Sequence, residues 1–150
     1  MSHTFTNLLT HIIFSTKDRA ASMATEIRSD VYAYLGGIAR ELGGTALIVN
    51  GTADHVHLLV KLPAELAVAD CVRLLKTNSS RWIHDKWPKR RTFAWQTGYG
   101  AFTVSTSAVG SVSRYIRDQD KHHRKMSFRD EFLAFLRKQG ITFDERFVFD

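Results

Sequence analysis

One short stretch constrains the fold more than any other. Residues 53–63 read ADHVHLLVKLP, an apolar and β-branched run ended by Pro63, which is typical of a strand. Side chains alternate between the two faces of a strand, so one face carries Val56, Leu58, Val60 and Leu62. The other face carries His55, His57, Leu59 and Lys61. The first set is typical of a core face, and the second places two imidazoles side by side.

Seven further segments show the periodicity of a strand or a helix. Short apolar runs predict strands over residues 11–16, 45–50 and 100–105. Apolar residues at helical spacing predict helices over residues 26–42, 66–87, 108–119 and 128–139. The order β-α-β-β-α-β-α resembles the ferredoxin-like, split β-α-β plan. We therefore expect an α+β fold, with an antiparallel sheet, helices on one face and a C-terminal helix that bears Tyr115. The histidine face is expected to stay open or to take a partner.

Composition bounds the class of protein. The chain has 150 residues and is 44% hydrophobic, enough for one domain over residues 1–150 with a real core. The N-terminus lacks the pattern of a signal peptide, and no apolar run is long enough for a membrane helix. The single Cys71 suits a reducing compartment. We expect a cytoplasmic protein with no membrane partner, and the lack of a phosphate-binding G-x-x-x-x-G-K-[ST] loop predicts no nucleotide cofactor.

The net charge of +6 is unevenly distributed. Residues 71–100 carry seven Lys and Arg against one acidic residue, and residues 101–125 carry five against two. The segments on either side are slightly acidic. A concentrated positive charge favours a polyphosphate partner such as nucleic acid. A solvated basic surface without a ligand explains the charge alone equally well.

Two imidazoles at positions i and i+2 of one strand can both reach one cation. His55 and His57 are therefore candidate metal ligands, although two half-exposed histidines without a ligand are the commoner meaning of such a pair. Asp54 points to the opposite side of the strand, so it is a poor direct ligand and could only support the site from behind.

A second group lies in the sequence SRYIRDQDKHH, residues 113–123. Tyr115 and Gln119 are four residues apart, so they share a face if the segment is one helix. A tyrosine hydroxyl can attack phosphorus or exchange protons, and an amide oxygen can bind a divalent ion. A core tyrosine and a surface glutamine are the usual explanation of this spacing. The surrounding basic residues favour a chemical role for this pair, because a phosphate bound there would need positive charges around it.

In a third group, residues 82–95 (WIHDKWPKRRTFAW), cations alternate with aromatic residues. Bases stack on aromatic rings while cations meet phosphates, so the pattern suits single-stranded nucleic acid. The alternative explanation, in which the tryptophans lie in the core and the cations are solvated, is at least as common for such a pattern.

Together these residues resemble a known family. The strand DHVHLL is similar to the His-hydrophobic-His (HUH) motif. The stretches HIIFSTKDR, LLKTNSSRWI and GYGAFTVSTSAVGSVSRYIRDQDKHH, with the C-terminal SFRDEFLAFLRKQGITFDERFVFD, are similar to the small single-tyrosine transposases of bacterial insertion sequences. The resemblance runs from His11 to Asp150 with the motifs in the family's order.

The resemblance implies a function. His55, His57 and Gln119 would bind Mg²⁺ or Mn²⁺, and Tyr115 would be the nucleophile. The substrate would be single-stranded DNA ends with hairpins, cleaved and rejoined by a homodimer through a 5′-phosphotyrosine. The third ligand would come from the tyrosine helix, which in this family can complete the histidine site of the other subunit, so docking of that helix could gate cleavage. His122 and His123 match a family pattern but receive no role.

The residues expected to contact DNA are Lys17, Lys76, Arg81, Lys89, Arg90, Arg91 and Lys121. Two other functions stay open. One is a binding module or repressor for single-stranded DNA or RNA that uses the same surface without chemistry. The other is a hydrolase in which the two histidines hold Zn²⁺ and water attacks.

Overall fold

The computed structural model describes residues 3–149. Its strands are β1 (Leu8–Ser15), β2 (Thr45–Gly51), β3 (His55–Leu62) and β4 (Gly100–Thr103). Its α-helices are α1 (Thr25–Glu41), α2 (Val68–Lys86), α3 (Val109–Arg117), α4 (Gln119–His122) and α5 (Phe128–Lys138). Short 3₁₀ turns span Lys17–Arg19, Pro88–Arg90 and Thr106–Ala108. Each predicted strand and helix has a counterpart with ends shifted by a few residues, except that the helix predicted over residues 108–119 is divided into α3 and α4.

The four strands form one antiparallel sheet in the order β2-β3-β1-β4. β3 is central, paired with β1 along its whole length and with β2 on its other side. This order, with α1 and α2 as the two crossovers, is the ferredoxin-like arrangement that the element order predicted. The two histidines therefore lie on a strand that has a neighbour on each side, and not on an edge strand.

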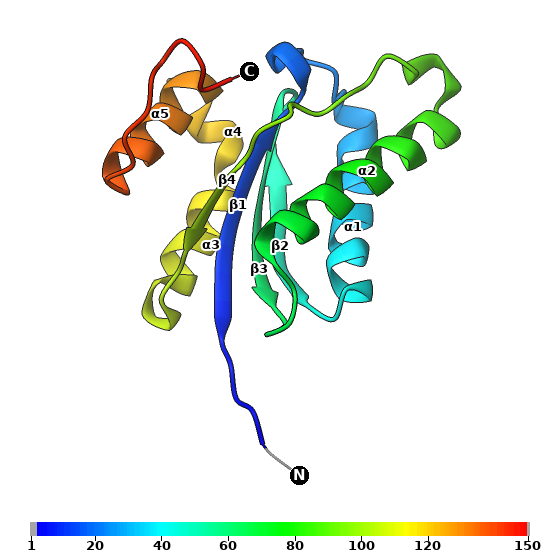
Figure 1. The fold of residues 1–150 in the computed structure, drawn as a ribbon. Coiled ribbons are helices and arrows are strands. Elements are labelled where there is room, and N and C mark those ends of the chain that lie inside the picture. The colour runs from blue at the N-terminus through cyan, green and yellow to red at the C-terminus, as the bar shows by residue number, and fades with distance from the viewer. Residues whose placement is uncertain (1–2, 150) are drawn as a thin grey trace.

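One face of the sheet carries the main core. Val56, Leu58, Val60 and Leu62 all belong to it, together with Ile12 and Phe14 of β1. α1 and α2 cover this face (Figure 1), and they contribute buried Ile27, Val31, Leu35, Val72, Leu75 and Ile83. The predicted core face of β3 is thus confirmed.

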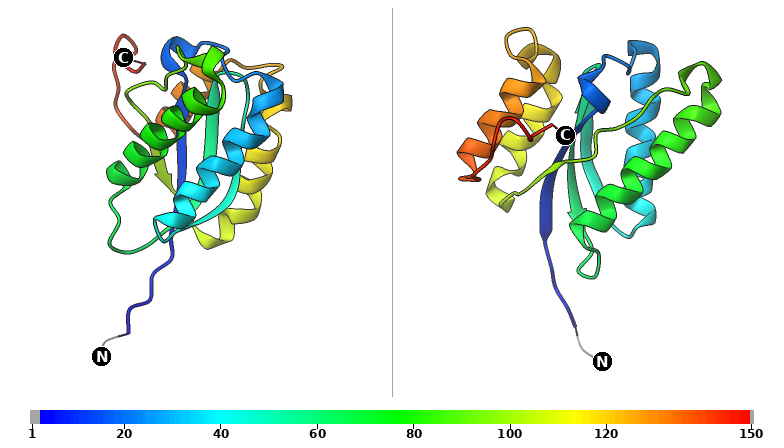
Figure 2. Two further views of the ribbon diagram at one scale, coloured as in Figure 1. Left: turned by 90° about the vertical axis from the view of Figure 1, so that its right-hand side faces the viewer. Right: turned by 45° about the horizontal axis from the view of Figure 1, so that its top comes forward.

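The opposite face differs from the expectation, because it is not open. α3, α4 and α5 lie on the histidine side of the sheet in all views (Figures 1 and 2). A second apolar cluster joins Ile13 and Phe102 of the sheet to four residues of α5, Phe128, Phe132, Leu133 and Leu136. Burial of these aromatic and aliphatic groups holds α5 on the sheet. As a result, the side chains of His55 and His57 are fully buried.

The predicted helix over residues 108–119 is also different, because it is divided at Asp118. Asn50 at the edge of the sheet donates hydrogen bonds from Nδ2 to the carbonyl oxygens of Ile116 (3.0 Å) and Arg117 (3.1 Å). These bonds satisfy the C-terminal carbonyls of α3, which therefore ends there. Asn50 also fixes α3 to β2, and so sets the position of Tyr115 over the sheet.

α5 has clear signals at both ends. The hydroxyl of Ser127 accepts a hydrogen bond from the amide of Asp130 at 3.1 Å, which caps the N-terminus. Gly140 follows the helix with a φ of 70°, a conformation that glycine adopts without strain. Within residues 3–149, no helix is both long and apolar enough to cross a bilayer.

Candidate active site

Three elements bring the predicted site residues together on the histidine face. β3 supplies His55 and His57, α3 supplies Tyr115, and α4 supplies Gln119. His55 Nε2 lies 2.9 Å from Gln119 Oε1, and both side chains are fully buried. The ring of Tyr115 lies edge-on to that of His57, with centroids 5.9 Å apart. All four groups come from one chain.

Asp54 orients the ring of His55 from behind. Its Oδ1 lies 2.7 Å from His55 Nδ1, and the hydroxyl of Thr52 lies 3.0 Å from the same nitrogen. The carboxylate can only accept, so Nδ1 carries the proton and Nε2 faces the site. A carboxylate behind a histidine is the usual support of a metal-ligating imidazole. The contact shows that Asp54 holds the ring of His55 in one orientation.

His57 has a different support. Its Nδ1 lies 2.8 Å from Nε2 of His11, a buried residue of β1. Burial, followed by repulsion from His57, lowers the pKa of His11 to about 3, so His11 is neutral. A neutral His11 can donate to His57 Nδ1, and His57 Nε2 then donates to Glu131. In the opposite tautomers His11 accepts from His57 Nδ1, and the lone pair of His57 Nε2 can bind a cation.

His123, which follows α4, is a third imidazole at the site. Its Nε2 lies 3.1 Å from Gln119 Oε1, and its ring is 4.4 Å from the ring of His55. Burial lowers the pKa of His123, but the hydrogen bond to Glu131, the negative charges of Glu131 and Asp54 and a backbone hydrogen bond at Met126 together outweigh it, so the pKa is raised overall. No role was predicted for this residue.

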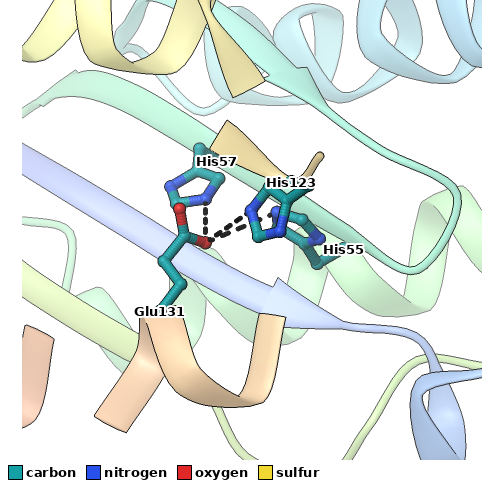
Figure 3. Close-up of side chains that lie close together, drawn as sticks. All are labelled: His55, His57, His123 and Glu131. Atoms are coloured by element: carbon teal, nitrogen blue, oxygen red, sulfur yellow. Dashed lines mark hydrogen bonds and ion pairs between the residues drawn. The ribbon is translucent and has the colours of Figure 1, made fainter. Parts of the chain in front are cut away.

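Glu131 of α5 lies at the centre of the site, and sequence reasoning missed it. Its Oε1 is 3.0 Å from His57 Nε2, 3.2 Å from His123 Nε2 and 3.5 Å from His55 Nε2. Figure 3 shows the three rings turned toward this one carboxylate. Its Oε2 accepts hydrogen bonds from the Tyr115 hydroxyl and from Gln119 Nε2, the latter at 3.3 Å. One carboxylate therefore contacts every predicted catalytic and metal-binding residue.

The charge of Glu131 controls the protonation of its neighbours. Burial raises the pKa of its carboxyl, but hydrogen bonds from His123 and His57 outweigh burial and hold the pKa far below its ordinary value. The tyrosine responds in the opposite sense, because burial and then the negative charge of Glu131 raise the pKa of Tyr115 far above its ordinary value. In this arrangement Glu131 is an anion and Tyr115 a neutral phenol.

The chemistry of the donors fits a divalent cation. His55, His57, His123 and Glu131 each offer one ligand atom, and these atoms lie within 4.8 Å of one another. With its proton on Nδ1, His55 presents a lone pair to Gln119 Oε1, which is also an acceptor. Two acceptors at 2.9 Å need either a second proton on the ring or a cation between them. A mixed set of imidazoles and oxygens suits Mn²⁺, Co²⁺, Ni²⁺ or Zn²⁺.

The predicted DNA-contact residues fall into separate places. Lys17, Lys89 and Arg90 line one surface pocket of about 420 Å³. Lys121 lines another, of about 530 Å³, with Tyr115, His122, Arg124 and Lys125. Arg81 and Arg91 are exposed, and Arg90 pairs with Glu26 at 3.2 Å. Basic groups thus flank Tyr115 on one side and form a second cluster at residues 17 and 89–90.

Lys76 stands apart from this set. Its ammonium group donates to the carbonyls of Gln96 at 2.8 Å, Thr97 at 3.2 Å and Gly98 at 2.6 Å. Burial lowers its pKa to about 8. In the described arrangement Lys76 therefore fastens the segment before β4 to α2, and its donors are already used.

A sequence signal for Glu131 did exist. Apolar residues of α5 recur at positions 128, 132 and 135, and Glu131 falls on the same helical face. A lone charge on an apolar face needs a partner. What the sequence could not show is which partner, since His55 and His57 lie more than 70 residues earlier.

The sequence is similar to one protein family and to individual transposases. A model of the family described as IS200-like transposases matches residues 4–119. The ISDra2 transposase TnpA of Deinococcus radiodurans is 27% identical over 114 residues, which cover 73% of this chain and 81% of that protein. The transposase for insertion sequence element IS200 of Salmonella typhimurium is 26% identical over 134 residues, covering 85% and 88% of the two chains.

Solved structures share the fold. A Deinococcus radiodurans R1 protein assigned as a transposase superposes with a TM-score of 0.64 and 25% identity, over 79% of this chain and 95% of that one. A REP-associated tyrosine transposase bound to a REP hairpin superposes with a TM-score of 0.59 and 13% identity, over 82% and 72%. The match of the family model to residues 4–119 spans most of the sequence. By that match, this chain belongs to the family of IS200-like transposases.

Proposed function

We propose that this transposase cleaves and rejoins single-stranded DNA, with Tyr115 as the nucleophile and a divalent ion held by His55, His57 and Gln119. One observation supports it above the others. The Tyr115 hydroxyl, the Gln119 amide and both imidazoles converge on a single point, the carboxylate of Glu131, within one chain. A phosphodiester at that point would touch the nucleophile and the metal ligands together.

The reaction is a transesterification. The Tyr115 oxygen attacks the scissile phosphorus and forms an O–P bond, while the bond from phosphorus to the 3′-oxygen breaks. The leaving 3′-oxygen takes up a proton, and the tyrosine loses one. When a 3′-hydroxyl later attacks the 5′-phosphotyrosine, the O–P bond to Tyr115 breaks and a strand is rejoined without ATP.

The bound ion, Mg²⁺ or Mn²⁺, would polarise a phosphoryl oxygen and stabilise the charge that develops on it. The side chains of the protein orient the ligands and bind the DNA. Asp54 and His11 fix the two imidazole rings, and Gln119 is placed by α4. Lys121, Arg124 and Lys125 beside Tyr115 can hold the flanking phosphates. The buried setting of the two histidines strengthens their interaction with a bound charge.

The expected substrate is a single strand with a hairpin end. The REP-associated relative was solved with a hairpin, and the basic clusters at residues 17, 89–90 and 121–125 suit a phosphate backbone. We expect the protein to act as a homodimer, as its resemblance to single-tyrosine transposases implies. Tyr115 and the three proposed ligands lie together in one chain, which is the arrangement in cis. The resemblance also implies an arrangement in which the tyrosine helix of one subunit completes the histidine site of the other.

The test is Tyr115→Phe, which removes one oxygen. In a denaturing gel with labelled single-stranded DNA and Mn²⁺, the wild-type protein should give a shifted covalent species, and the variant should give neither this species nor cut DNA. DNA affinity should stay the same, because Tyr115 is one contact among many. Continued cutting by the variant would indicate a hydrolase that uses water, and no cutting by either protein would indicate a binding module.

A further inference from the structure

Glu131 and His123 are candidates for a role beyond the three ligands proposed above. Both lie outside residues 4–119, the span that the family model matches. Both nevertheless contact the proposed ligands: His123 Nε2 is 3.1 Å from Gln119 Oε1, and Glu131 Oε1 is 3.0 Å from His57 Nε2. The C-terminal part of this chain thus adds an imidazole and a carboxylate to the site.

The spacing of these atoms is that of ligands around one ion. Two ligands that are each about 2.1 Å from an ion lie about 3.0 Å apart at a right angle and about 3.4 Å apart at a tetrahedral angle. Oε1 of Glu131 lies 3.0, 3.2 and 3.5 Å from the three Nε2 atoms. Oε1 of Gln119 lies 2.9 and 3.1 Å from two of them. Five donor atoms are therefore already at ligand spacing.

Five protein donors would leave little room for a substrate. A divalent ion that takes six ligands keeps one position open beside five protein donors, but the Tyr115 hydroxyl already donates to Glu131. A scissile phosphate that must contact this hydroxyl therefore meets the carboxylate of Glu131. Of the five groups, Glu131 is the carboxylate, so its replacement by a phosphodiester exchanges one negative charge for another.

Glu131 also matches a phosphate in its contacts. One of its oxygens faces the three imidazoles, and the other accepts from the Tyr115 hydroxyl and from Gln119. A scissile phosphate must place one oxygen near the metal ligands and its phosphorus next to the same hydroxyl. The carboxylate and the phosphate therefore need the same place, and α5, which carries Glu131, is held there by its own apolar cluster.

We propose that His123 and Glu131 complete a five-donor metal site in the DNA-free protein, and that Glu131 yields its place to the scissile phosphate when DNA binds. The proposal rests on the metal-assisted function above. Three imidazoles make the DNA-free site selective for Mn²⁺, Co²⁺ or Zn²⁺ over Mg²⁺, which prefers oxygen ligands.

The test measures Mn²⁺ affinity from the electron paramagnetic resonance signal of free Mn²⁺. All proteins carry Tyr115→Phe, so that no strand is cut. Without DNA, Glu131→Gln should weaken Mn²⁺ binding by more than about a hundredfold, because the loss of an outer contact alone costs roughly 10–100-fold. Asp130→Asn is the matched control, because it removes the same charge from the preceding, exposed position, and it should have no effect.

The second arm adds a saturating amount of short, mixed-sequence single-stranded DNA. The affinities of the Glu131→Gln variant and its parent should then become equal, because the phosphate replaces the carboxylate in both. A difference that persists unchanged with DNA would overturn the exchange. Equal affinities without DNA would overturn ligation by Glu131.

A further variant separates this inference from the proposed function. If His57→Ala loses Mn²⁺ binding while Glu131→Gln keeps it, the metal site stands and only the role of Glu131 fails. If His57→Ala binds as the parent does, the metal site itself fails. The role of His123 is tested by electron spin-echo spectra of Mn²⁺ bound to the Tyr115→Phe protein. Coupling of Mn²⁺ to three imidazole nitrogens supports the proposal. Coupling to only two would overturn ligation by His123. Circular dichroism would verify that each variant is folded.

Discussion

The two faces of the sheet bury side chains for different purposes. Under α1 and α2, the buried residues of β1 and β3 are apolar, and they form one large cluster. Under α3 to α5, β3 buries two histidines and β1 buries a third, and the apolar cluster is confined to one end around α5. Burial of polar groups costs free energy unless each finds a partner. The comparison indicates that the first face supplies the stability which allows the second to keep a polar, chemically active interior.

The largest expected difference comes from Leu58 and Leu59, which are neighbours in β3 and are both fully buried. Leu58 faces the main core, whereas Leu59 faces the histidine side and belongs to neither apolar cluster of the described residues. Leu58→Ala should lower the free energy of unfolding by about 4 kcal/mol and Leu59→Ala by about 2–3 kcal/mol, because fewer apolar neighbours lose contact. Urea unfolding would measure both values. Equal losses would mean that the histidine face contributes as much stability as the core.

A smaller effect should come from metal. Mn²⁺ at a concentration one hundred times its dissociation constant should raise the free energy of unfolding by about 2.7 kcal/mol. Leu58→Ala should keep this increment although the protein starts from a lower stability, since distant sites add. His57→Ala should lose it. If the increment survives His57→Ala, the metal does not bind at the histidine face. If it disappears with Leu58→Ala, metal binding at that face depends on the main core.

The smallest effect should come from the cap of α5. Ser127→Ala removes the acceptor for the amide of Asp130 and should destabilise the helix by about 1 kcal/mol. Because α5 is attached to the sheet through the smaller cluster, amide hydrogen exchange should become faster in α5 while that of α1 stays the same. Faster exchange in both helices would mean that α5 unfolds only with the whole molecule.

Much of the fold was predictable, because its signals are local. Alternation in residues 53–63 separated the core face from the histidine face, and helical spacing located α1, α2 and α5. The break between α3 and α4 was not predictable, since it depends on the amide of Asn50, 66 positions before Ile116. The coverage of the histidine face was missed for the same reason: α5 shows an apolar stripe in the sequence, but not the surface on which that stripe packs.

The site was predictable to a similar extent. Motif resemblance selected His55, His57, Tyr115 and Gln119, and the structure brings these side chains together. It could not select Glu131, which is a charged residue in an otherwise apolar stripe, or His11, which is one of seven histidines in the chain. Lys76 was expected to contact DNA from its position in a basic stretch, yet its ammonium group is used by three backbone carbonyls.

The order of the chain has a consequence for how the protein is made. All four strands and both helices of the main core precede residue 104, whereas Glu131 comes near the end. Segments that leave the ribosome first can fold first. The imidazole pair can therefore form on a finished sheet while its carboxylate is still to be synthesised, so that free cations of the cell meet these histidines before the protein's own anion does.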